Sequence, residues 1–145
     1  MTPQKVKYGL GICSFLLGAS IYLLWRDEGI LCNRIASYTG LMHAIQPLRN
    51  SALALNTPEW FRFSLPDGLW IIAYLLIIDA ALPDRNDKFV WISAIPMVGI
   101  LSELLQWAGL FPGIFDPVDL LFYATPYIIY IIWLKKHLLS VTKEP

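Results

Sequence analysis

The sequence predicts an all-α membrane protein with four transmembrane helices and an interfacial helix between the first and the second. Hydrophobic residues make up 57% of the 145 residues and charged residues only 15%, whereas a soluble domain carries about 25% charged residues. Four apolar runs are each about as long as the roughly 17–25 helical residues that cross a bilayer. We therefore expect residues 1–145 to form a single integral membrane domain.

The predicted transmembrane segments are residues 8–25, 65–82, 89–111 and 118–134. The first follows two lysines, as in a signal peptide, but it is longer than the roughly 7–15 apolar residues usual there, and no small-residue cleavage site follows it. We therefore expect an uncleaved helix. Short connections join the second, third and fourth segments, which predicts that they are antiparallel neighbours.

Residues 26–64 form the one long segment outside these spans. Its apolar residues recur at three- and four-residue steps, the period of an amphipathic helix: Leu31, Ile35, Tyr38, Met42 and Ile45. Pro47 is expected to end that helix, and Thr57-Pro58 resembles a cap followed by a first-turn proline. Aromatic residues suited to the head-group level follow: Trp60, Phe61 and Phe63, around Arg62. We expect an interfacial, extracytoplasmic segment; an ordinary polar loop is the alternative.

The distribution of Lys and Arg predicts the orientation. Seven of these residues would lie on the side of the N-terminus and four on the other side: Lys5, Lys7, Arg85, Lys88, Lys135, Lys136 and Lys143 against Arg26, Arg34, Arg49 and Arg62. The positive-inside rule then predicts a multi-pass protein of the cell membrane with both termini in the cytoplasm. Asp79 and Asp84, near the inner end of the second span, are expected to be solvated or interfacial.

Five polar residues of the last three spans are expected to meet at the outer end of the bundle, because adjacent helices are antiparallel: Asp67, Glu103, Gln106, Asp116 and Asp119. Glu103 lies roughly 12 Å along its helix from that end. An ionisable group at this depth costs several kcal/mol unless it is protonated, paired or facing water, so Glu103 is the first functional candidate. Gln106 shares its face three residues later. Arg62 is the best-placed cationic partner.

Each of these residues also has a structural interpretation. Ser64-Leu65-Pro66-Asp67 matches a helix cap, a first-turn proline and an acid, and Asp116-Pro117-Val118-Asp119 repeats that arrangement. Glu103 could be a protonated acid that joins helices by a hydrogen bond. Neither interpretation is decided by the sequence.

Other kinds of site have little support. No motif indicates a cofactor, a metal site or a catalytic nucleophile, although clustered carboxylates leave a divalent cation such as Mg²⁺ or Ca²⁺ open. The formal net charge is zero and no basic tract favours nucleic acid. Gly11, Ser14 and Gly18 share one face of the first span, which is typical of close helix packing, and a homo-oligomer through that helix is left open.

The C-terminal half resembles the VanZ-like family of small bacterial membrane proteins. The resemblance is carried by Glu103-Leu-Leu-Gln106, a short turn, and Gly113-Ile-Phe-Asp116-Pro-Val-Asp119, with Asp67 at the place of an acid in an earlier helix. It covers roughly residues 65–130. The turn lacks the family's usual Arg, no His follows Asp67, and Tyr123 and Pro126 stand where the family commonly has Asn and Gly.

The resemblance implies a protein of the cell envelope, since the founding member is associated with resistance to lipid-bearing glycopeptide antibiotics. We therefore expect an acid-lined pocket, open to the outer leaflet, that binds a lipid, a lipid-linked precursor or an amphiphilic antibiotic. Its lining would comprise Glu103, Gln106, Asp116, Asp119 and Asp67. The alternatives are a metal-assisted enzyme acting on lipid head groups and a structural or channel-forming oligomeric subunit.

Overall fold

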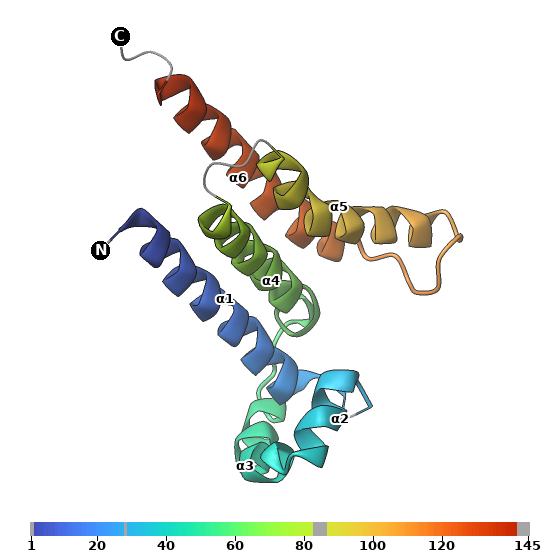
Figure 1. Ribbon diagram of the computed structural model, residues 1–145. Helices are drawn as coiled ribbons and strands as arrows, with labels where there is room; N and C mark the ends of the chain where they lie inside the picture. The colour runs from blue at the N-terminus through green and yellow to red at the C-terminus, as the bar shows by residue number, and fades with distance from the viewer. Residues whose placement is uncertain (1, 28, 83–86, 142–145) are drawn as a thin grey trace.

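The computed structural model describes residues 2–27, 29–82 and 87–141, with side chains described as far as residue 135 (Figure 1). Across these residues the chain forms six helices and no strand: α1 (Pro3–Trp25), α2 (Leu31–Tyr38), α3 (Leu41–Leu53), α4 (Glu59–Ala81), α5 (Lys88–Trp107) and α6 (Pro117–Val141). Four of them, α1, α4, α5 and α6, are long and apolar enough to cross a membrane. The predicted fold class is therefore confirmed. Asp84, Arg85 and Lys143 lie outside the described residues.

Helix α4 begins earlier than predicted. It starts at Glu59, directly after Pro58 at the N-cap position, so Pro66 and Asp67 lie inside the helix and not at its start. The prediction that Asp67 belongs to a capping motif is therefore wrong. An interior proline removes one backbone hydrogen bond. Breaking the helix at Pro66 would leave several backbone groups without hydrogen-bond partners at membrane depth. The free-energy cost of that break is larger than the cost of one lost hydrogen bond.

The other boundaries shift by a few residues. Helix α5 ends at Trp107, four residues short of the predicted end, and a turn with Gly109 and Gly113 at positive φ leads to α6. Helix α6 starts at Pro117, as expected within one residue, and continues past residue 134.

The segment before α4 holds two helices and not one. Gly40, with a φ of 76°, separates α2 from α3, because a left-handed backbone conformation suits glycine. Pro47 lies inside α3, so the prediction that it ends the helix is wrong. The predicted apolar positions Leu31, Ile35 and Tyr38 are exposed on the outer face of α2. That face suits the boundary between head groups and acyl chains, which favours the interfacial segment over a polar loop.

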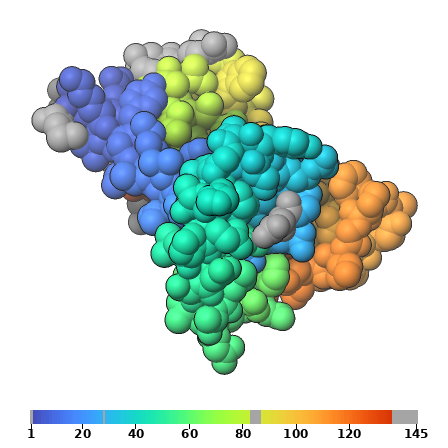
Figure 2. Space-filling model, turned by 90° about the horizontal axis from the view of Figure 1, so that it is seen from below, coloured from blue at the N-terminus to red at the C-terminus, as the bar shows by residue number. Residues whose placement is uncertain are grey.

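Two buried polar side chains on the inner face of this segment hold the end of α1. The side-chain amide of Asn33 donates to the carbonyls of Arg26 and Asp27, at 3.0 and 2.9 Å. The guanidinium of Arg49 donates to the carbonyl of Leu23 at 2.6 Å and also to that of Arg26. These donors satisfy carbonyls that a helix end leaves without partners. Figure 2 shows α2 and α3 covering this end of the molecule.

Helix α4 is the central helix and packs against α1, α5 and α6 (Figure 1). Two glycines of the predicted stripe allow α1 to approach it closely. A Cβ on Gly18 would lie 2.6 Å from the Trp70 indole nitrogen, and one on Gly11 would lie 3.2 Å from the Ala73 carbonyl. The stripe is therefore occupied by α4 of the same chain, and an oligomer through α1 would have to use another face of that helix.

Candidate functional site

Four of the predicted acids gather where α5 ends and α6 begins. This is the same end of the bundle as α2 and α3, and we call it the α2–α3 end. The Tyr123 hydroxyl of α6 donates to the Asp67 carboxylate of α4 at 3.0 Å. Glu103 and Asp119 both interact electrostatically with Asp67 and with Tyr123. We call Asp67, Glu103, Asp116, Asp119 and Tyr123 the carboxylate cluster. The antiparallel topology thus places these acids together, as predicted.

Glu103 anchors the start of α6. Its side chain is buried, with 5% of the residue exposed, and its Oε2 accepts a hydrogen bond from the backbone N–H of Asp116 at 3.1 Å. The Asp116 carboxylate in turn accepts from the backbone N–H of Val118 at 2.8 Å. Asp116 therefore caps α6, as its motif predicts, and Asp119 lies in the first turn of that helix.

Gln106 contacts the turn rather than the acids. A Cβ built on Gly113 would lie 2.7 Å from the amide carbon of Gln106, so the side chain packs directly on the glycine backbone. Gly113 has a φ of 137°, a conformation that other residues rarely adopt. The turn thus requires glycine on two grounds. Glu103 and Gln106 share a face, and both of them hold the segment between α5 and α6.

The predicted cation Arg62 is not brought to the acids. Its guanidinium lies 5.4 Å from the centre of the Phe63 ring, and no ion pair joins it to an acid within the described ranges. The arginine that interacts with an acid of the cluster is Arg26 instead. It lies over the rings of Tyr22 and Phe63, at 4.7 and 4.6 Å, and interacts electrostatically with Asp67. The position of Arg26 directly after the first predicted span could have indicated this role from the sequence.

The carboxylate cluster joins helices and does not form a compact set of metal ligands. Where side chains are described, no three His, Cys, Asp or Glu residues come close enough together to hold a metal ion. One Asp119 oxygen is buried without a hydrogen-bond partner. The Asp67–Tyr123 and Glu103–Asp116 bonds join α4, α5 and α6, so the cluster fixes the positions of three helices relative to one another.

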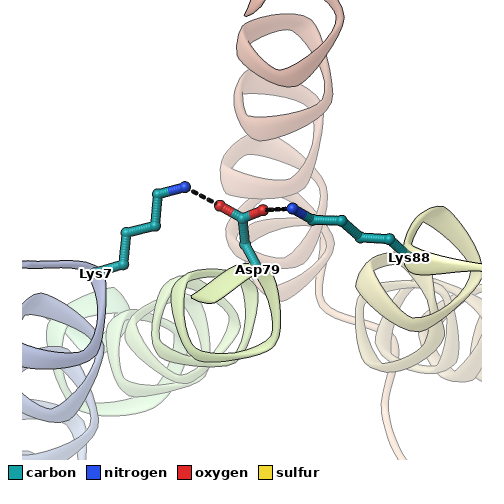
Figure 3. A network of polar contacts seen from close by, with 3 residues as sticks. All are labelled: Lys7, Asp79 and Lys88. Carbon is teal, nitrogen blue, oxygen red and sulfur yellow. Dashed lines mark hydrogen bonds and ion pairs between the residues drawn. The ribbon is translucent and has the colours of Figure 1, made fainter. Parts of the chain in front are cut away.

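A second ionic cluster lies at the opposite end of the bundle, which we call the Lys7 end. Figure 3 shows the carboxylate of Asp79 between the ammonium groups of Lys7 and Lys88, which come from α1 and α5. The Asp79 side chain is 1% exposed. The expectation that Asp79 is solvated is therefore wrong, and an interfacial position stays a prediction. Two ammonium partners offset the large cost of burying a carboxylate.

Helix α6 completes the Lys7 end. The Lys7 ammonium lies 5.1 Å from the centre of the Trp133 ring, a distance suited to a cation–π contact. The Tyr130 hydroxyl lies close to the Asp79 carboxylate. All four spanning helices therefore contribute a polar or aromatic group here. The topology that brought the acids together also places Lys7, Asp79 and Lys88 at one end, so the sequence carried the signal for this cluster.

A cavity of about 700 Å³ runs between α4 and α6. Its walls are mainly apolar, and they include Leu65, Gly68, Ile72, Phe122 and Ile129, with Lys7 and Trp133 at one end. We call it the α4–α6 groove. None of the six residues predicted to bind a ligand is part of its lining. Gly68 and Phe122, however, adjoin Asp67 and Tyr123 in sequence, so the carboxylate cluster borders the other end of the groove.

Comparison of the chain with models of protein families, with curated proteins and with solved structures gave no match.

Proposed function

We propose that this protein is a VanZ-like membrane protein of the bacterial cell envelope that binds a lipid, a lipid-linked precursor or an amphiphilic antibiotic. The apolar chain of the ligand would lie in the α4–α6 groove. The observation that carries the proposal is the groove itself: about 700 Å³, with apolar walls, between two helices that are long and apolar enough to cross a membrane.

The size and setting of the groove favour an acyl chain. Small-molecule sites commonly enclose about 300–1,000 Å³. Several residues along the groove expose their side chains, among them Ile72 and Ile129. A groove of this kind between two spanning helices opens to lipid, so acyl chains are the molecules that reach it at the highest concentration.

Affinity and selectivity have to come from the ends of the groove. Lipid tails are as apolar as leucine, so moving a chain from bilayer to groove gains little hydrophobic free energy. Packing against the walls and polar contacts at the ends remain. The groove has a polar group at each end: the carboxylate cluster beside Gly68 and Phe122, and Lys7. In this proposal the predicted acids lie beside one end of the groove and hold the helices that form it in position.

Filling the groove with a bulky side chain tests the proposal, and two neighbouring isoleucines of α6 provide a matched pair. Ile129 lines the groove and is 62% exposed, whereas Ile128 lies outside the lining and is 53% exposed. We expect Ile129→Trp to lower the amount of co-purified lipid several-fold and Ile128→Trp to leave it unchanged, by mass spectrometry of protein in mild detergent. Equal lipid in wild type and both variants would refute binding in the groove.

The cellular readout uses the same pair. Expression in a susceptible bacterium should raise the inhibitory concentration of a lipid-bearing glycopeptide antibiotic, and Ile129→Trp should abolish that protection while Ile128→Trp retains it. Lipid binding without any effect on susceptibility would keep the binding site and remove the assignment to antibiotic protection.

A further inference from the structure

We propose that Lys7 binds the phosphate of an anionic phospholipid whose acyl chain occupies the α4–α6 groove. The inference rests on the proposed function and adds to it the class of head group and the end of the groove at which that head group lies. Three features of the Lys7 end support it: the charge of the lining, the state of the Lys7 ammonium, and the length and aromatic border of the groove.

The lining carries one kind of charge. Among its described residues Lys7 is the one with a charged type of side chain, since the others are apolar residues, glycine, proline, a threonine and aromatic residues. The acids of the carboxylate cluster border the groove without lining it. A ligand inside the groove therefore meets a cation at the Lys7 end, and the complementary head group is an anion.

The Lys7 ammonium stays accessible although it pairs with Asp79, whose carboxylate also contacts the Lys88 ammonium. The Lys7 side chain is 26% exposed while that of Asp79 is 1% exposed, so an incoming anion can reach the ammonium and not the carboxylate. An ammonium group has three N–H donors. One donor goes to Asp79, which leaves donors for phosphate oxygens.

The length of the groove fits one acyl chain of a lipid. Along α4 the lining runs from Leu65 to Leu76, which is about 16 Å of helix and about half of a hydrocarbon core of roughly 30 Å. Trp133 and Tyr130 line the groove at the Lys7 end, and such residues favour the head-group level. Lys7 lies in the second turn of α1, where a lysine side chain extends toward the phosphates.

The experiment compares two lipids and four lysine variants. Purified protein is exchanged into mixtures of phosphatidylglycerol and phosphatidylcholine with identical acyl chains, and the bound lipid is identified by native mass spectrometry. One partly exposed lysine at a membrane surface corresponds to roughly a fivefold preference for an anionic lipid. We therefore expect wild type to prefer phosphatidylglycerol about fivefold, Lys7→Gln to lose the preference, and Lys7→Arg to keep it.

Lys5→Gln is the matched control, because Lys5 lies two residues earlier in α1, has the same charge and is exposed. It should keep the preference. Loss of the preference in both Gln variants would overturn the proposal in favour of general surface charge. Because Lys7→Gln leaves a buried carboxylate with one partner fewer, the double variant Lys7→Gln/Asp79→Asn is measured as well, and it should lose the preference while remaining folded.

The outcomes separate this inference from the proposed function. If Ile129→Trp loses lipid while Lys7→Gln keeps the phosphatidylglycerol preference, the groove binds lipid and the role of Lys7 is refuted. If Ile129→Trp has no effect on lipid, the proposed function fails first. A wild type that binds both lipids equally in the groove would also refute a phosphate site at Lys7.

Discussion

At the scale of single residues, three acids of the spanning helices are each stabilised by a different kind of partner. Asp79 is held by two ammonium groups, Asp67 by the hydroxyl of Tyr123, and Glu103 by a backbone N–H. These partners predict different sensitivity to loss of charge. An ion pair requires the charge, whereas a hydroxyl or an N–H requires only an acceptor oxygen.

Glu103 is the residue where this distinction matters most. Its bond to the Asp116 N–H needs an acceptor, and an amide oxygen serves. We expect Glu103→Gln to retain thermal stability in detergent and lipid co-purification. Glu103→Ala should lose about 1–3 kcal/mol of unfolding free energy, because the partly buried N–H of Asp116 is left without this partner. If the Gln variant is as stable as wild type but no longer protects cells, the carboxylate charge itself is used, and Glu103 is the functional centre that the sequence predicts.

Asp116 tests the helix cap separately. Its carboxylate accepts from the Val118 N–H in the first turn of α6. Asparagine caps nearly as well as aspartate, so Asp116→Asn should be mild, while Asp116→Ala should cost about 0.5–2 kcal/mol of unfolding free energy. Denaturant unfolding followed by circular dichroism measures both. Equal destabilisation by Asn and Ala would show that the charge at the start of α6 matters more than the hydrogen bond.

At the scale of the elements, the prolines mark where sequence reasoning succeeded and where it failed. Pro117 follows Asp116 at the start of a helix, as predicted, whereas Pro66 and Pro47 lie inside helices. The rule that proline marks a helix boundary comes from chains in water, where freed backbone groups bind solvent. In α4 the surroundings are apolar, so the helix continues through Pro66. Local sequence could not show this, because the cause lies in the environment.

The sequence predicted the carboxylate cluster better than the groove. Residue order and antiparallel topology suffice to bring Glu103 near Asp116. A groove depends on how far α4 and α6 stand apart, and that separation follows from side chains distributed along both helices, such as Gly68 and Phe122. Short contacts of this kind cannot be read from spacing along one helix.

The contact between α1 and α4 gives a prediction at this scale. A Cβ on Gly18 would lie 2.6 Å from Trp70 and 3.1 Å from the carbonyl oxygen of Pro66, which is backbone and cannot easily move. We expect Gly18→Ala to destabilise the protein by about 1–3 kcal/mol. Gly9 in the same helix has nothing within 4 Å, so Gly9→Ala should be neutral or stabilising by up to about 1 kcal/mol. Thermal unfolding in detergent compares the two, and equal melting temperatures would show that α1 and α4 can separate at little cost.

At the scale of the whole molecule, polar groups are concentrated at the two ends of the bundle. The carboxylate cluster and Arg26 lie at the α2–α3 end, and Lys7, Asp79 and Lys88 lie at the other. Between them the long helices expose apolar side chains to lipid. The orientation of the chain in the membrane therefore decides which leaflet supplies the head group at each end.

The distribution of Lys and Arg predicts that both termini are cytoplasmic, so the Lys7 end should face the inner leaflet. The native Cys13 and Cys32 are first replaced by serine, and single cysteines are then placed at exposed positions on the two sides, as Gln4→Cys and Asn56→Cys. A membrane-impermeant maleimide should label Asn56→Cys in intact cells and Gln4→Cys only after permeabilisation. Labelling of Gln4→Cys alone in intact cells would show that the orientation is the reverse of the predicted one. The phosphate site would then take its lipid from the outer leaflet.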